Sequence, residues 1–169
     1  MKKLSLVFAL LLIVGCEGPM GPPGEDGLPG PVGQAFEVEA NFNESNDYGQ
    51  VFEIPAGIEV YESDIVAVYL LWEVDEGTDY DVWQPLPASV FFEDGELQYA
   101  FDHTVADVQL FLTGNTNLST LPDSYTQNQI FRVAILPVDY VKAKDINMSS
   151  MDEVMQAVDK SKIQRLRLN

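Results

Sequence analysis

Basic residues are scarce in this chain: nine lysines and arginines stand against 27 aspartates and glutamates in 169 residues, a formal net charge of -18. The chain also has a single cysteine and a single histidine. The shortage of positive charge argues against nucleic acid as a partner, because binding phosphates requires a basic footprint. One histidine and one cysteine are too few for an ordinary zinc site. No Gly-x-Ser-x-Gly motif accompanies His103, so the sequence does not indicate a serine hydrolase of that kind.

Long apolar runs are also rare, and the clearest one covers residues 4–14, after Lys2 and Lys3 and before Gly15. This layout is typical of a secretory signal peptide, and the run is shorter than the roughly 20 residues of a membrane-spanning helix. Because Cys16 follows directly, the segment resembles the lipobox of bacterial lipoproteins. The resemblance implies a signal peptide at residues 1–15, cleavage before Cys16, diacylglycerol on its sulfur and acylation of the new amino terminus.

Six consecutive Gly-X-Y triplets follow, from Gly18 to Ala35, and they contain half of the 12 glycines and five of the 10 prolines. Glycine at every third position with proline between is the composition of collagen, in which only glycine fits at the axis of three chains. One interpretation is a stiff single-chain linker, about 55 Å long if each residue adds ~3.1 Å. The other is a triple helix that makes a homotrimer through residues 18–35, with help from the neighbouring domain.

A lipobox cysteine, Gly-X-Y triplets and a compact domain, in that order, resemble the small collagen-like lipoproteins of Bacteroidetes-type bacteria. The apolar run at residues 65–75 is also similar to segments of their terminal domains. The resemblance implies a lipid-anchored protein of the outer membrane, on its surface or its periplasmic face, and brings no established activity with it. We therefore expect a signal peptide (1–15), a lipidated cysteine with a collagen-like linker (16–35) and one acidic domain (36–169).

Residues 36–169 read mostly as strands. Alternating apolar and polar residues at 36–42 indicate a half-buried strand, and the apolar run at 65–74 indicates a strand covered on both faces. Asp94 and Gly95 separate the short runs 90–92 and 97–101, which is a hairpin signal. Further strand candidates lie at 51–54, 105–112, 130–136 and 163–168. Many short strands of this kind favour an antiparallel β-sandwich.

One helix is expected late in this domain. Ser150 and Glu153 have the spacing of a capping box, and Met151, Val154 and Val158 continue at helical spacing. The sequence therefore predicts a mainly β fold: an antiparallel β-sandwich with one short late helix, preceded by the extended collagen-like segment.

Three acidic residues, Asp75, Asp79 and Asp81, lie in the densest acidic loop and are weak candidates for calcium ligands. Their spacing does not match an EF-hand, and a solvated turn is the simpler interpretation. Asp79 and Asp81 are also the example of paired carboxylates that a polysaccharide or cell-wall hydrolase would need. Trp83 is a weak candidate for stacking on a ligand, whereas Trp72 is expected in the core.

Charge is distributed unevenly along the chain. Without Lys2 and Lys3, seven basic residues remain against 27 acidic ones, a net charge of -20, and six of the seven lie between Lys142 and Arg167. The basic segment is expected to pair with the acidic body of its own domain or of a neighbour. We expect a non-enzymatic envelope lipoprotein without a cofactor, in a structural role or binding an extracellular or periplasmic partner. The alternatives are the hydrolase and a calcium-dependent adhesion module.

Overall fold

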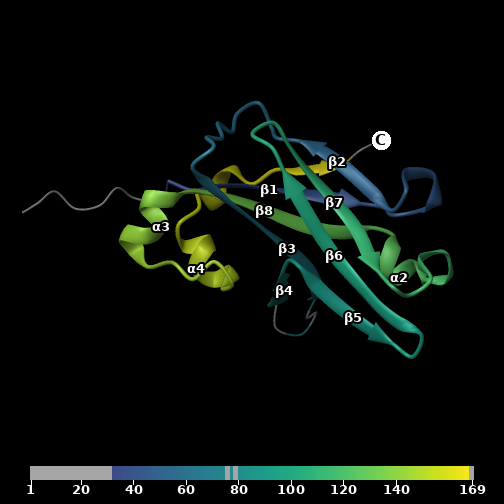
Figure 1. Ribbon diagram of the computed structural model, residues 1–169. Coiled ribbons are helices and arrows are strands. Elements are labelled where there is room, and N and C mark those ends of the chain that lie inside the picture. The colour runs from purple at the N-terminus through teal and green to yellow at the C-terminus, as the bar shows by residue number, and fades with distance from the viewer. Residues whose placement is uncertain (1–31, 75–76, 78–79, 168–169) are drawn as a thin grey trace, which may run out of the picture.

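The computed structural model describes residues 32–74, 77 and 80–167, and there the chain is mainly β, with two sheets and several short helices (Figure 1). Cys16 and the first four triplets lie outside the described residues. The last triplet, Gly33-Gln34-Ala35, lies within them, and its second and third residues belong to the first strand. The folded part thus begins earlier than the expected boundary at Phe36.

The first sheet has the order β4-β3-β8-β1-β9 among the described residues. Its strands are β1 (Gln34–Ala40), β3 (Asp64–Val74), β4 (Asp81–Pro85), β8 (Gln129–Pro137) and β9 (Arg165–Arg167). Neighbouring strands run antiparallel except that β9 runs parallel to β1. The prediction of an antiparallel fold is therefore wrong for this edge, because the chain crosses the sheet's outer face before it returns beside β1.

The second sheet has the order β2-β7-β6-β5, all antiparallel. Its strands are β2 (Gly49–Glu53), β5 (Ala88–Phe92), β6 (Gly95–His103) and β7 (Asp107–Gly114). The predicted hairpin is confirmed, since β5 and β6 pair with Phe92 opposite Gly95. Short helical segments join the strands: η1 (Glu44–Asn46), η2 (Leu118–Thr120) and α2 (Asp123–Thr126).

One hydrophobic core joins the two sheets. Every second residue of β1 points inward, as the alternation predicts, and Phe36, Val38 and Ala40 are fully buried. Across the core, the ring of Tyr99 on β6 lies 6.2 Å from that of Phe131 on β8, centroid to centroid. The two sheets are therefore packed face to face around aromatic and branched side chains.

Helices cover part of the outer face of the first sheet. These are α3 (Val138–Lys144) and α4 (Met151–Gln156), followed by η3 (Lys160–Lys162); Figure 1 shows α3 and α4 together at one end of the sheets. Tyr69 of β3 is fully buried beneath them. Its hydroxyl donates to the carbonyl oxygen of Met148 (2.6 Å), and burial raises its pKa to about 12.

The helix at Met151 is confirmed, with Ser150 as its N-cap accepting from the Glu153 N–H. The expectation of a single late helix is wrong, because α3 precedes it. Signals for α3 are present in the sequence: it begins after Pro137, has Asp139 in its first turn and lysines in its last. These charges complement the helix dipole.

Candidate binding groove beside the first strand

Gly33 joins the start of β1 to the segment that follows α4. Its N–H donates to the carbonyl oxygen of Ala157 (2.9 Å), and the Asp159 N–H donates to the carbonyl oxygen of Gly33 (3.2 Å). The two segments approach so closely that a Cβ here would lie 3.0 Å from the Ala157 oxygen and 3.0 Å from Leu136 Cγ. A glycine therefore suits this close approach, and the last glycine of the triplet run is also a structural residue of the domain.

A gap in main-chain pairing follows along β1. Gly33 bridges to Val158, and the next pairing is Glu37 with Arg165, so β1 advances four residues where the other segment advances seven. The three extra residues contain η3 and bulge away. Alternate residues of a strand direct their N–H and C=O groups to the same side, so those of Ala35 face the gap. Among the described residues, no main-chain hydrogen bond joins Ala35 to the bulging segment.

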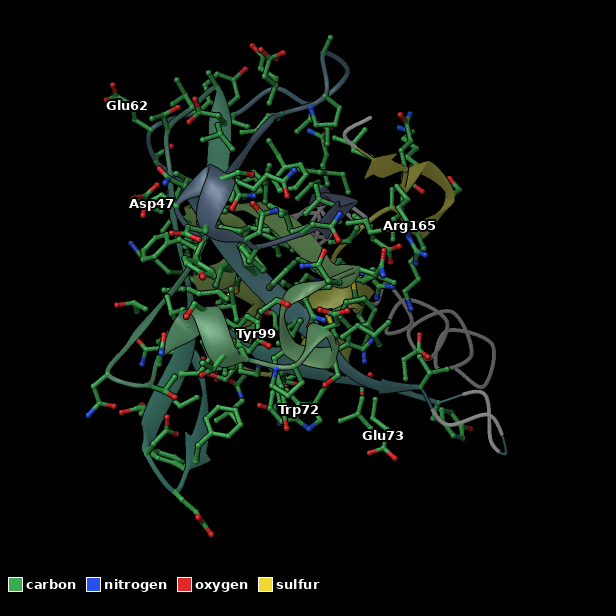
Figure 2. All side chains as sticks on the ribbon, turned by 90° about the vertical axis from the view of Figure 1, so that its right-hand side faces the viewer. Asp47, Glu62, Trp72, Glu73, Tyr99 and Arg165 are labelled. Atoms are coloured by element: carbon green, nitrogen blue, oxygen red, sulfur yellow. The ribbon has the colours of Figure 1, made fainter. Side chains whose placement is uncertain are left out.

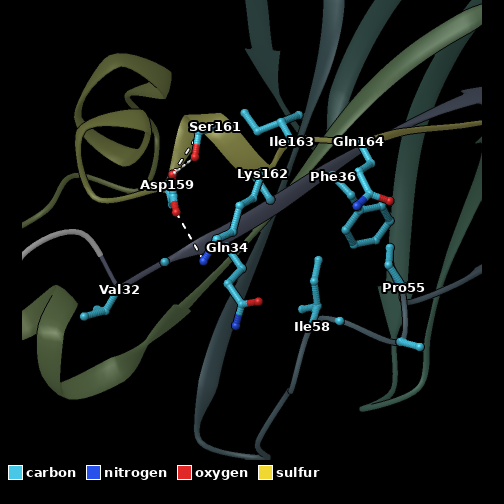
Figure 3. A pocket seen from close by; sticks show the side chains of 14 residues that line it. Val32, Gln34, Phe36, Pro55, Ile58, Asp159, Ser161, Lys162, Ile163 and Gln164 are labelled. Carbon is cyan, nitrogen blue, oxygen red and sulfur yellow. Dashed lines mark hydrogen bonds and ion pairs between the residues drawn. The ribbon is translucent and has the colours of Figure 1, made fainter.

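The gap opens into a groove of about 860 Å³ (Figure 3). The start of β1, the loop before β3 and the segment at 159–164 line it. Its wall combines apolar side chains, such as Ile58 and Ile163, with the amides of Gln34 and Gln164. A groove with apolar walls, amide groups and open main-chain groups is suited to an extended peptide.

Asp159 organises the bulging segment. Its carboxylate accepts from the N–H (3.1 Å) and hydroxyl (2.6 Å) of Ser161, and it pairs with Lys162 Nζ at 3.3 Å. These hydrogen bonds from Ser161, and then the contact with Lys162, hold the pKa of Asp159 below its usual range. The pair leaves this side of the groove close to neutral.

A charged cluster lies beyond the groove, where β9 begins to pair with β1. Glu37 Oε1 accepts from Nε (3.0 Å) and Nη2 (2.6 Å) of Arg132, while Oε2 accepts from Nε of Arg165 (2.8 Å). Arg132 also lies over the ring of Trp83, with its guanidinium carbon 4.1 Å from the ring centroid. Burial alone would raise the pKa of Glu37, but the two arginines outweigh it and lower the pKa. The carboxylate is therefore charged, with both oxygens engaged, and acts as a clamp between β8, β1 and β9.

Of the three acidic candidates, only Asp81 belongs to the described residues. Asp75 and Asp79 lie outside them, and Asp81 is exposed at the first residue of β4. In the part of the chain that the structure describes, no group of three potential metal-ligating side chains occurs, and no helix has the length and apolarity to cross a membrane. His103 is exposed, with its ring stacked 6.4 Å from that of Phe101.

The two tryptophans differ in burial, and the expectation that Trp72 lies in the core is wrong. Trp83 is half-buried beneath Arg132, whereas Trp72, expected in the core, is 39% exposed. Leu71 and Glu73 pair with the consecutive residues Trp83 and Val82, so Trp72 is the extra residue of a β-bulge. The bulge breaks the alternation that would otherwise place Trp72 inside, and Figure 2 shows it beside Glu73 at one end of the molecule.

Sequence reasoning missed the groove. It expected the basic C-terminal segment to pair with the acidic body of its own domain or of a neighbour, and Arg165 does pair with Glu37 of the same domain, but it did not predict the part played by Arg132. The available signal was Arg132, the only basic residue between Cys16 and Val141, within an otherwise apolar strand. An arginine that is mostly buried, as Arg132 is with its side chain 18% exposed, is usually paired with a carboxylate. The sequence does not say which one, because Glu37 lies 95 residues away. Comparison of the chain with protein families, with curated proteins and with solved structures gives no match.

Proposed function

We propose that this protein is an envelope lipoprotein, held in the outer membrane by acyl chains on Cys16, that presents an acidic β-sandwich on a collagen-like spacer. Its role is binding or surface architecture and not catalysis. The observation that carries the proposal is the junction: the Gly-X-Y run continues into β1 without a linker of other composition.

The junction suits a tether. β1 is an inner strand of its sheet, paired with β8 on one side and β9 on the other. A pull along the spacer therefore acts on two ladders of hydrogen bonds together, with the Gly33 contacts as a further attachment. A domain joined through a loose linker or an edge strand would resist such a pull less well.

The physical properties of the lipid anchor, the acidic domain and the spacer agree with this role. Two or more acyl chains give stable anchoring where one gives only marginal binding. A mature net charge of -20, from seven basic and 27 acidic residues, keeps a crowded protein dispersed through mutual repulsion. A proline-rich spacer then holds the domain away from the bilayer.

The test is Cys16→Ser in the full chain, produced in a Gram-negative host. We expect the wild type to incorporate labelled palmitate, to partition into the detergent phase of Triton X-114 and to sediment with the outer membrane. The variant should lose all three properties because it has no sulfur to acylate. Ser5→Ala, within the apolar run, is the control and should keep them. Equal label and equal partitioning of wild type and Cys16→Ser would overturn the proposal.

A further inference from the structure

We infer that the groove beside β1 binds the Gly-X-Y segment of a second copy of this chain, so that the domains themselves hold the collagen-like spacers together. The inference rests on the proposed function in one respect, the collagen-like interpretation of residues 18–35. It does not depend on lipid attachment.

The main-chain chemistry of the groove matches such a segment. One residue of β1, Ala35, directs an N–H and a C=O into the groove without a main-chain partner in the adjoining segment. Ala35 is only 4% exposed, and buried main-chain groups are almost always hydrogen-bonded. A polyproline-type chain has no internal hydrogen bonds, and in a triplet such as Gly21-Pro22-Pro23 only glycine has an N–H. The single N–H of such a triplet and one of its three C=O groups can pair with the C=O and the N–H of a single unpaired strand residue.

The place where the spacer enters favours a neighbour's segment over the chain's own. Val32, the first described residue, lies on the rim of the groove, so chains that meet through their spacers bring a second segment to this rim. The chain's own segment would have to reverse direction at once. Leu28 and Gly30 each precede a proline, and the residue before a proline is biased towards extended backbone, so the sequence disfavours such a reversal.

Charge supports the same occupant. Three acidic domains repel one another, but the groove lies within the basic part of the chain. Lys160 is exposed at its border, and the side chain of Lys162 on its wall is 80% exposed. Among the six triplets only Gly24-Glu25-Asp26 carries charge, and that charge is acidic. Beside the nearly neutral Asp159–Lys162 pair, exposed Lys160 adds positive charge at this border, so a neighbour's acidic triplet meets less repulsion here than over the acidic remainder of the domain.

The first test is disulfide trapping in the Cys16→Ser background, which has no other thiol. One set of chains carries a cysteine in the Gly-X-Y segment, either Leu28→Cys or Glu25→Cys one triplet earlier. These chains are mixed with chains that carry Ala56→Cys, at an exposed position of the groove. We expect a covalent heterodimer after mild oxidation. Phe91→Cys, 78% exposed on β5 of the other sheet, replaces Ala56→Cys as the control and should give little product.

The second test fills the groove. Gly57 lines it, its backbone lies outside the left-handed region, and a Cβ there would meet nothing within 4 Å. We expect Gly57→Trp to keep the fold, to abolish trapping and to lower the sedimentation mass of residues 17–169 to that of a monomer. Val51→Trp, at a half-exposed position of β2, is the matched control and should change neither measurement.

Three results would overturn the inference. One is a monomer for the unsubstituted chain at all concentrations. The second is trapping that persists with Gly57→Trp. The third combines two observations: a chain carrying both Leu28→Cys and Ala56→Cys forms an intrachain disulfide, and the mixture of the two single-cysteine chains forms no heterodimer. That result would assign the groove to the chain's own segment. All three leave membrane anchorage untouched, so they are distinct from failure of the proposed function.

Discussion

The carboxylate of Glu37 accepts hydrogen bonds from Arg132 and Arg165, which come from the strands on either side of it. Replacing it with glutamine leaves two arginines without a counter-charge. We expect Glu37→Gln to lower the free energy of unfolding by about 2–3 kcal/mol, which is in the range for hydrogen bonds to charged groups. Breaking a fully buried ion pair would cost more, but Arg165 is partly exposed. Urea unfolding at neutral pH measures this change in stability.

The same variant tests the lowered pKa of Glu37. A carboxylate whose pKa is lowered by folding contributes stability above its ordinary value of 4.5, and that contribution is lost as the pH falls through the lowered pKa. The difference in stability between wild type and Glu37→Gln should therefore shrink below pH 4.5. A difference that stays constant into strong acid would contradict the assignment. Glu53→Gln, exposed on β2, is the control and should change stability by less than about 0.5 kcal/mol.

At the scale of the element, the pairing of β6 with β7 requires a glycine at the end of β7. Gly114 has a φ of 138°, and a Cβ there would collide with the carbonyl oxygen of Glu96. We expect Gly114→Ala to lower the free energy of unfolding by more than about 2 kcal/mol, since it adds both strain and a clash. Gly57→Ala is the matched comparison and should be neutral or stabilising by about 0.4–1 kcal/mol, because its site is open. Equal effects of the two substitutions in urea unfolding would refute this reading of the hairpin.

At the scale of the whole molecule, excess negative charge opposes folding. Ion pairs join Glu37 to Arg132 and Arg165, and Asp159 to Lys162, while the whole sequence, with nine basic and 27 acidic residues, has a formal net charge of -18. Raising NaCl from about 20 mM to about 500 mM shortens the screening length from about 20 Å to about 4 Å. We expect the melting temperature to rise by a few degrees, which corresponds to a gain in the free energy of unfolding of the order of 1 kcal/mol.

The control for this effect is CaCl₂ at matched ionic strength. Equal shifts with the two salts are expected for screening alone. A much larger shift with calcium would indicate a bound ion that stabilises the folded state and would favour the calcium-dependent adhesion module instead. A fall in melting temperature with NaCl would contradict the repulsion argument.

Several parts of the fold were predictable because their signals are local. Alternation along β1, the Asp94-Gly95 turn and the Ser150 cap each depend on a few neighbouring residues, and the structure contains each element. Local signals failed where pairing decided the outcome. Trp72 is exposed because a register shift between β3 and β4 interrupts the alternation. Strand β4 begins at Asp81, within the stretch that the sequence favours as a solvated turn.

The sequence by itself determined the strand pattern, the acidic composition and the Gly-X-Y run from Gly18 to Ala35, and it predicts lipid attachment at Cys16, because each depends on composition or short-range spacing. Only the tertiary structure decided that Arg132 and Arg165, 95 and 128 residues from Glu37, meet on its carboxylate. It also decided that Ala35 faces a groove. The reason is physical: burial imposes a local period on every strand, whereas the choice of neighbouring strands and their register depends on how the whole chain packs.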